Sequence, residues 1–361
     1  MIKALFGMGA FALSLSTILT IGSRALAKNL HAIAVPSGRR QHKTPTPQLG
    51  GLGIGVAILL LLAIGIHFGL LTDALIQGQQ LAGFGIGVMI LLIVGLLDDI
   101  YEWSAVARFS LYAFASLIVV LAGTTVRAVT CLDGHACSLL WWQSPGFFLD
   151  TFRLQLSFPG DLLAWAWLFM VTFTTKLLDG LDGLVTGQTM IGAFIILLLT
   201  LTPFFFQPPV ALLAVIILGS YAGFLPSNFP PAKQYLGESG SILAGFSLAF
   251  LSLVSGAKMA MAFLALGLPL IDMIIVVFER VRAGRAPWVG DRTHLHFRLQ
   301  DAGGLSPLQA VGLLWSLSFV FGAAALLVKT EGKIILAICV VMTTIALRTW
   351  CTRRITRRKK V

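Results

Sequence analysis

Charged residues are scarce in this chain of 361 residues. They make up 11% of the sequence, whereas a soluble domain usually carries about 25%. Hydrophobic residues make up 57%, and the mean hydropathy is +0.90. The shortage of charge therefore excludes an ordinary soluble domain and predicts a protein that lies mostly within a membrane.

Cysteine is also rare, with four residues, which are too few for a disulfide framework. Cys131 and Cys137 lie in the segment 123–160, where either a bridge between them or two free thiols would be reasonable. Cys339 and Cys351 are predicted to pack within the membrane. The segment 123–160 is too polar and too broken for a clean span, and we expect it to lie along the membrane interface.

Long apolar runs recur along the whole chain, and each is near the length that a bilayer requires. We therefore predict an all-α fold, a polytopic transmembrane helical bundle of about 11 spans that forms one integral-membrane domain over residues 1–361. The predicted spans are 2–22, 49–71, 81–97, 105–122, 161–178, 184–202, 210–226, 241–256, 259–278, 307–328 and 334–350.

Most of the 26 Lys and Arg residues fall on one of the two sides that these spans define. The positive-inside rule places that side in the cytoplasm, with the N-terminus outside and the C-terminus inside. The predicted cytoplasmic parts are 23–48, 98–104, 176–183, 227–240, 279–306 and the basic tail 351–361. The segment 123–160 is then outside.

Five polar clusters interrupt the apolar sequence, all on the predicted cytoplasmic side. Ionisable groups at such places are costly in a membrane protein and often mark function. The first cluster, 36–47, contains Arg39 and His42, and its prolines exclude a regular helix. It is either a topology signal or a rigid basic loop that faces anionic phosphates.

The second cluster is the adjacent pair Asp98 and Asp99 at the end of an apolar run. Neighbouring carboxylates repel each other unless a cation lies between them. The pair therefore suits a metal and phosphate site or a general base. A plain helix cap at the membrane exit is the structural alternative.

The third cluster joins Lys176 to a glycine-rich acidic segment. Asp179 and Asp182 are three residues apart, so on a helix they would share a face. Gly180 and Gly183 allow a ligand to approach the backbone closely. Such a turn before a helix favours nucleotide or phosphate binding, whereas the plain alternative is a flexible loop with two solvated acids.

The fourth cluster runs from Asn228 to Ser241 and places Glu238 between two glycines just before a span. Glu238 is a plausible metal ligand or acid. Ser239 or Ser241 could instead serve only to cap the following helix.

The fifth cluster, 291–298, contains His294, His296 and Arg298. A His-x-His pair can chelate a metal, but histidines flanked by arginines more often bind phosphate or pyrophosphate. Upstream, Asp272 lies inside an apolar run and is either functional or paired with a buried cation.

Taken together, residues from about 36 to 298 resemble the polyprenyl-phosphate N-acetylhexosamine-1-phosphate transferase superfamily, of glycosyltransferase family 4 type. The segments 229–233 and 291–298 resemble its branch that uses UDP-GlcNAc or a related UDP-N-acetylhexosamine. The resemblance implies that undecaprenyl phosphate attacks the β-phosphate of the UDP-sugar and that UMP leaves, as the first step of a cell-surface glycan.

The resemblance also implies a location and partners. The enzyme would lie in a bacterial inner membrane, with its active site on the cytoplasmic face. Its partners would be undecaprenyl phosphate and a UDP-N-acetylhexosamine, without nucleic acid, and a homodimer remains open. The alternatives are the peptidoglycan branch, which uses UDP-MurNAc-pentapeptide, and a membrane lipid or solute transporter, which would place its polar residues near the bilayer midplane.

Roles for individual residues follow from the same resemblance. The implied catalytic residues are Asp98 and Asp99. The nucleotide would be bound by Asp179, Gly180, Asp182, Gly183 and Asn228. The phosphates would be bound by Arg39, His42, Lys176, His294, His296 and Arg298. The metal, Mg²⁺ or Mn²⁺, would be bound by Glu238 and Asp98.

Three positions depart from the pattern of the superfamily. Lys176 stands where asparagine is usual, Glu238 where aspartate is usual, and Phe297 where many members have a third histidine. One hypothesis reconciles the first two changes. Lys176 supplies a fixed cation near the diphosphate, and the longer Glu238 either reaches the metal or pairs with Lys176.

Overall fold

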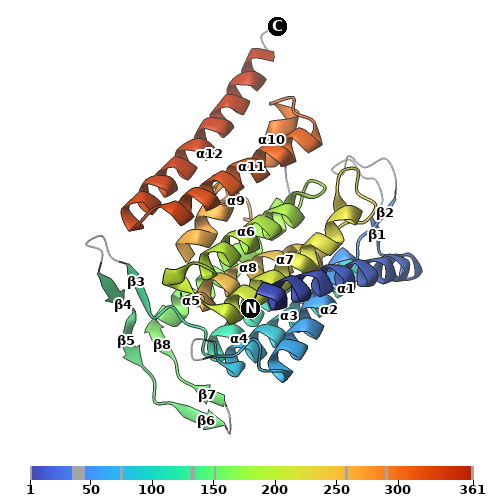
Figure 1. Cartoon of the computed structure of the whole chain (residues 1–361). Coiled ribbons are helices and arrows are strands. Elements are labelled where there is room, and N and C mark those ends of the chain that lie inside the picture. The colour runs from blue at the N-terminus through green and yellow to red at the C-terminus, as the bar shows by residue number, and fades with distance from the viewer. Residues whose placement is uncertain are drawn as a thin grey trace.

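The protein folds into a bundle of long helices with a set of short strands at one end (Figure 1). This computed structural model describes residues 2–34, 45–73, 76–130, 135–149, 152–256, 259–288 and 292–358. Its helices are α1 (Ile2–Asn29), α2 (Gly50–His67), α3 (Gly78–Tyr101), α4 (Ala105–Leu121), α5 (Gly160–Leu178), α6 (Leu184–Thr200), α7 (Pro208–Asn228), α8 (Gly237–Val254), α9 (Met259–Arg282), α10 (Leu295–Asp301), α11 (Pro307–Leu327) and α12 (Thr330–Arg358), with a 3₁₀ turn η1 (Pro203–Phe205).

Nine of the helices in the described part of the chain are long and apolar enough to cross a membrane. Two further apolar helices, α4 and α6, are each 17 residues long. Each predicted span overlaps one of these helices, which confirms a mostly helical, multi-pass membrane fold. The exact number of spans and the orientation of the chain stay predictions.

The segment 123–160 contains strands, so the all-α prediction is too narrow. Three antiparallel pairs form there: β3 (Ala128–Thr130) with β4 (Ala136–Ser138), β5 (Leu140–Gln143) with β8 (Ser157–Pro159), and β6 (Phe147–Leu149) with β7 (Phe152–Leu154). Aromatic and β-branched residues favour strands, and the polar breaks between them keep each strand short. Cys137 in β4 is disulfide-bonded, whereas Cys131 lies outside the described residues.

A fourth antiparallel pair lies at the other end of the bundle from these strands (Figure 1). It joins β1 (Ile33–Ala34) to β2 (Thr46–Pro47) just before α2 begins. The predicted basic loop 36–47 therefore connects two paired strands at its ends, while residues 35–44 lie outside the described part of the chain.

The centre of the bundle is α8, which is buried along its whole length. It packs against α2, α3, α5 and α6. Phe84 of α3 stacks on Phe246 and Phe250 of α8, with ring centroids 5.7 and 4.3 Å apart. Although α8 carries Glu238 and four serines, every residue from Glu238 to Val254 is buried, as its central position in the bundle requires.

The start of α8 is held very close to two neighbouring helices. A Cβ atom on Gly51 of α2 would lie 2.0 Å from the backbone nitrogen of Gly240, and one on Gly95 of α3 would lie 2.2 Å from the Cα of Ser239. Side chains larger than hydrogen would therefore push the helices apart. This close contact fixes the position of Glu238 in the first turn of α8.

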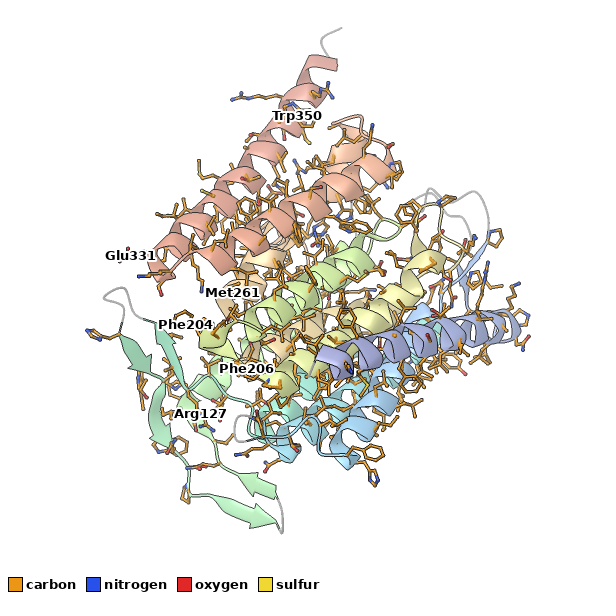
Figure 2. The ribbon with its side chains drawn as sticks, in the orientation of Figure 1. Arg127, Phe204, Phe206, Met261, Glu331 and Trp350 are labelled. Carbon is orange, nitrogen blue, oxygen red and sulfur yellow. The ribbon has the colours of Figure 1, made fainter. Side chains whose placement is uncertain are left out.

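The two ends of the bundle carry different elements. Figure 2 places Arg127, Phe204 and Glu331 together on the left side of the view, near the strands, and places Trp350 near the top. At the opposite end from the strands, α3, α5 and α7 finish, and α8 and α10 begin (Figure 1). The polar clusters of the sequence therefore gather at one end of the bundle.

Candidate active site

Asp98 and Asp99 lie in the last turn of α3 and have different partners. Asp98 accepts hydrogen bonds from the Nη1 of Arg108, at 3.0 Å, and from the backbone N–H of Trp103, at 2.9 Å. Both oxygens of Asp99 accept from the backbone N–H of Glu238, at 2.9 and 3.2 Å. Asp99 therefore caps the N-terminus of α8, where the helix dipole favours a negative charge.

Glu238 is buried, with 4% of its surface exposed, and both of its carboxylate oxygens are engaged. Oε1 accepts a hydrogen bond from the hydroxyl of Tyr112, and Oε2 forms an ion pair with Lys176. The Nη1 of Arg108 lies 3.7 Å from the same Oε2 and also contacts Asp98. A buried carboxylate requires such compensation, and Glu238 receives it from two cations and a phenol.

Lys176 reaches this carboxylate from the last turn of α5. Its side chain keeps 29% of its surface exposed and also interacts electrostatically with Asp179, Asp99 and Asp98. One ammonium therefore lies among four carboxylates. The sequence left two alternatives for Glu238, which could reach a metal or pair with Lys176. The structure contains the ion pair with Lys176.

The acidic segment 179–183 forms a turn between α5 and α6. Asp179 follows the last residue of α5, and Gly183 precedes α6 with a positive φ of 77°, a conformation that favours glycine. The helical spacing that would place Asp179 and Asp182 on one face is therefore not present. The turn brings the acidic segment next to the loop that follows α7.

Asn228 and Asp182 dock this turn onto the loop after α7. The Oδ1 of Asn228 accepts from the backbone N–H of Gly183 at 3.1 Å and from the hydroxyl of Thr186 at 2.7 Å. The Oδ2 of Asp182 accepts from the backbone N–H of Ala232 at 2.9 Å. These bonds support the shape of the turn, while the nucleotide contacts implied for its residues stay predictions.

His294 precedes α10, and both of its ring nitrogens are engaged. Nδ1 lies 3.0 Å from Oδ2 of Asp272, and that oxygen also accepts from the backbone N–H of Leu295 at 3.0 Å. Nε2 lies 3.3 Å from the Nη2 of Arg280. Since a guanidinium only donates, the arrangement assigns the proton of His294 to Nδ1.

Asp272, buried within α9, is also held by a cation from the end of the chain. Its Oδ1 pairs with the Nη1 of Arg348 in α12. The Nη2 of the same arginine contacts both oxygens of Glu279, at 3.0 and 2.8 Å. The alternative that Asp272 is paired with a buried cation is therefore confirmed.

His296 is almost fully buried, and its Nε2 has no hydrogen-bond partner within the described part of the chain. The ring is parallel to that of His294, with centroids 5.8 Å apart. Burial, with a smaller contribution from the neighbouring His294, lowers the pKa of His296 to about 3. Its Nε2 faces Gly180, where an added Cβ atom would approach it to 2.4 Å. A neutral imidazole therefore borders the acidic turn.

Other predicted phosphate-binding residues are placed differently. The Nε of Arg298 donates to the backbone oxygen of Thr293 at 2.6 Å, and its Nη1 lies 3.3 Å from Thr352 of α12. Arg298 thus braces α10 against α12, and its phosphate contact stays a prediction. Arg39 and His42 lie outside the described residues, as does Asp291 at the start of the fifth cluster.

Several residues of the site, among them Arg108, Arg348 and Tyr112, were not among the predicted site residues. Arg108 and Arg348 count in the sequence only as charges on one side of the membrane, and Tyr112 lies inside an apolar helix. Arg108 is ten residues from Asp98, whereas the contacts of the other two span 126 and 76 residues. Only the fold brings these partners together.

A divalent cation held by Glu238 and Asp98, as the resemblance implies, does not fit the residues present. The Glu238 carboxylate contacts an ammonium and a guanidinium, and Asp98 contacts the same guanidinium. Mg²⁺ requires oxygen ligands in near-octahedral geometry, and two cations already lie on these oxygens. Among the residues that the structure describes, no group of three or more His, Cys, Asp or Glu side chains is placed to hold a metal.

Comparison with known proteins identifies the family. The model of glycosyl transferase family 4 matches residues 81–256. A decaprenyl-phosphate N-acetylglucosaminephosphotransferase of Mycolicibacterium smegmatis is 30% identical over 338 residues, covering 86% of this chain and 79% of that protein. A probable undecaprenyl-phosphate N-acetylglucosaminyl 1-phosphate transferase of Bacillus subtilis is 28% identical over 331 residues, covering 89% and 84%.

A relative from the peptidoglycan branch is also similar. The phospho-N-acetylmuramoyl-pentapeptide-transferase of Desulforamulus reducens is 28% identical over 303 residues, covering 79% of this chain and 82% of that protein. The family match contains Asp98, Lys176 and Glu238, and the relatives span most of the chain. The chain therefore belongs to glycosyl transferase family 4 and is an enzyme of its phospho-N-acetylhexosamine transferase type.

Proposed function

We propose that this enzyme transfers N-acetylglucosamine 1-phosphate from UDP-GlcNAc to undecaprenyl phosphate and releases UMP. The reaction takes place at the cytoplasmic face of a bacterial inner membrane and starts a cell-surface glycan. The observation that carries the proposal is the meeting of Asp98, Asp99, Lys176 and Glu238 at one end of a membrane bundle, in a chain whose relatives bear the names of such transferases.

The location of the cluster suits the two substrates. A UDP-sugar is soluble in water, whereas the phosphate of a polyprenyl lipid lies at the level of the headgroups. A site at helix ends reaches both, whereas a site at the bilayer midplane reaches neither. Membership in an enzyme family likewise favours the transferase over the transporter alternative.

The reaction is a phosphoryl substitution at the β-phosphorus of UDP-GlcNAc. A phosphate oxygen of the lipid forms a new bond to that phosphorus, and the bond from the β-phosphorus to the bridging oxygen breaks. UMP leaves with the bridging oxygen and its electron pair. Such substitutions require positioning and neutralisation of charge more than covalent help from the protein.

The residues divide this work between two parts of the site. Asp98 is the group that would accept a proton from the lipid phosphate, and Arg108 orients its carboxylate at 3.0 Å. Lys176 would neutralise charge on the diphosphate. On the other side of the acidic turn, the Nε2 of His296 would hydrogen-bond a phosphate oxygen, because it has no partner among the residues described.

A second donor has one specific observation in its favour. The relative from Desulforamulus reducens, named for transfer of phospho-N-acetylmuramoyl-pentapeptide, covers 79% of this chain at 28% identity. The two relatives named for GlcNAc transfer cover somewhat more of the chain at similar identity, 86% and 89%. We therefore place UDP-GlcNAc first and UDP-MurNAc-pentapeptide second.

The test is UMP release by the full chain in lipid nanodiscs that contain undecaprenyl phosphate. UDP-GlcNAc, UDP-GalNAc and UDP-MurNAc-pentapeptide are supplied in parallel, with Mg²⁺ present. We expect lipid-dependent UMP with UDP-GlcNAc at the highest kcat/KM. Faster release from UDP-MurNAc-pentapeptide would move the protein to the second donor, and no lipid-dependent UMP from any donor would contradict the proposal.

Two variants control this assay. Asp98→Asn removes the proposed proton acceptor at the end of α3 and should abolish UMP release. Asp73→Asn changes a carboxylate near the opposite end of the same helix, where it accepts from the backbone N–H of Ile76 at 2.8 Å, a bond that asparagine can also accept. This control should keep the rate of the unchanged protein.

A further inference from the structure

Two departures from the family pattern meet in one contact. Lys176, where asparagine is usual, forms an ion pair with Glu238, where aspartate is usual. The contact joins the end of α5 to the first turn of α8. Replacing a neutral amide by an ammonium adds a positive charge to the position where a divalent cation would lie. The longer glutamate meets that ammonium, so the two changes are complementary.

Arg108 adds a second positive charge to the same carboxylate. Its Nη1 lies 3.7 Å from Oε2 of Glu238 and 3.0 Å from Oδ2 of Asp98. Lys176 and Arg108 together carry the charge of one divalent cation. They also contact both of the side chains that the resemblance names as metal ligands.

The ion pair is held firmly by its surroundings. Glu238 is 4% exposed, and Tyr112 donates to its other oxygen. Gly51 and Gly95 bring α2 and α3 against the start of α8, so the backbone that carries Glu238 has little room to move. A divalent cation would have to displace an ammonium from this enclosed carboxylate against like-charge repulsion in a site of low dielectric constant.

The ammonium of Lys176 is placed to do electrostatic work on a phosphate. Lysine binds phosphate as a point charge, with three donors that can turn toward different oxygens. Its side chain is 29% exposed, so it is less enclosed than the Glu238 carboxylate, whose side chain is 3% exposed. A fixed cation that requires no reorganisation is the kind of group that stabilises charge developing on a leaving phosphate.

We propose that Lys176, anchored by Glu238 and assisted by Arg108, replaces the divalent cation of the family, so that this transferase works without a metal ion. In the reaction written above, the Lys176 ammonium neutralises the bridging oxygen as it leaves with UMP. Apart from the proton that Asp98 accepts from the lipid phosphate, no other bond changes, and no co-reactant is needed. The inference rests on the proposed transferase function and names the cation that serves it.

The experiment uses the full chain in nanodiscs after removal of metals with a chelating resin. UMP release from UDP-GlcNAc and undecaprenyl phosphate is measured in EDTA and in Mg²⁺, and thermal unfolding is followed with and without Mg²⁺ or Mn²⁺. We expect the same lipid-dependent rate in both buffers. We also expect no shift of the unfolding temperature, because a metal that does not bind does not stabilise the folded state.

A double variant, Lys176→Asn with Glu238→Asp, restores the usual family residues and should restore a need for metal. We expect it to release UMP in Mg²⁺ but not in EDTA, and to unfold at a higher temperature when Mg²⁺ is present. Lys176→Asn alone should be less active than the double variant in Mg²⁺. The matched control is Lys28→Met, which changes a lysine in the last turn of α1 and should leave the rate unchanged.

The outcomes separate this inference from the proposed function. Lipid-dependent UMP in EDTA supports both. Lipid-dependent UMP only in Mg²⁺, together with a metal-dependent rise of the unfolding temperature, overturns the inference and leaves the transferase function intact. If the cooperatively folded protein releases no UMP in either buffer from any of the donors, the function itself fails, and the inference fails with it.

Discussion

Two charged regions meet at the site end of the bundle, and they are built differently. The Lys176–Glu238 region comes from α3, α4, α5 and α8 and lies within the segment that matches the family model. The Asp272–His294 region comes from α9, α10 and α12 and lies outside that segment. In the first region the Lys176 side chain is 29% exposed, whereas the Arg348 side chain in the second region is 7% exposed.

We propose that this difference separates a reactive region from a supporting one. In the Asp272–His294 region, the two ring nitrogens of His294 contact Asp272 and Arg280, and Asp272 also accepts a hydrogen bond from the backbone N–H of Leu295. His296 stacks on His294 in this region and is buried, and its Nε2 has no hydrogen-bond partner among the described residues. In the Lys176–Glu238 region, two partly exposed cations contact Glu238, and we propose that they meet the charges of the substrates. Gly180 is where the two regions touch.

Among the variants that compare the two regions, the largest effect is expected from removing the cation of the first region. Lys176→Met keeps the length of the side chain but leaves the diphosphate without its nearest positive charge. We expect kcat to fall on the order of 10²–10³-fold, as when one stabilising donor is removed from a preorganised site. Added Mg²⁺ should not restore the rate. A variant with nearly unchanged kcat would show that Lys176 only fills space.

A smaller loss is expected where the two regions touch. In Gly180→Ala the new methyl group meets the Nε2 of His296 at 2.4 Å and the ring of Phe297 at 2.6 Å, so the imidazole must move. We expect kcat to fall about 10²-fold, because small misplacements in a preorganised site are costly. Gly312→Ala, where nothing lies within 4 Å of the added atom, is the control. If both variants had equal rates, His296 would have no role in the reaction.

The support behind His294 should affect stability more than rate. Arg348→Met leaves the buried Asp272 without its cation but with its bonds to His294 and Leu295. We expect a loss of about 3 kcal/mol in the free energy of unfolding and a smaller loss of kcat than for Gly180→Ala. Denaturant unfolding in detergent measures the first, with the exposed Arg353→Met in the same helix as control. A fall in kcat without a fall in stability would assign Arg348 to the reaction itself.

A further effect, confined to acid, is a dependence of stability on pH. The pKa of His296 is about 3 in the folded protein and about 6.5 in an unfolded chain, so the unfolded chain binds the extra proton between these values. The stability that His296 contributes is therefore fully present above about pH 6.5 and is lost toward pH 3, by at most about 1.4 kcal/mol per pH unit.

His296→Gln removes this titration and should unfold at a lower pH than the unchanged protein in an acid titration. His67→Gln, at the exposed end of α2, should follow the unchanged protein. If both variants unfolded at the same pH as the parent, His296 would not be held neutral by its burial.

The helices were predictable because a bilayer supplies no partner for the backbone, so apolar runs must form helices. The strands of 123–160 were not, because each has only three or four residues and shows no periodicity. The gathering of the polar clusters followed from the alternation of helix ends. Their exact partners did not follow, since Tyr112 is 126 residues from Glu238 and carries no signal within its apolar helix.

Within the site, the Lys176–Glu238 contact was one of two alternatives that the sequence left open, and geometry decided between them. The helical spacing of Asp179 and Asp182 misled because α5 ends before them. The sequence predicted Arg348 only as one of the positive charges on the cytoplasmic side, because its partner Asp272 lies on another helix, 76 residues away. Single residues signal chemistry in a sequence, whereas ion pairs between helices are a property of the fold.

The most direct test follows the β-phosphate itself. UDP-GlcNAc labelled in that phosphate is given to the metal-free protein with undecaprenyl phosphate, in EDTA and in Mg²⁺, and label in the lipid is measured over time. The account predicts labelled lipid at the same initial rate in both buffers. Label that enters the lipid only when Mg²⁺ is present would contradict the replacement of the metal by Lys176.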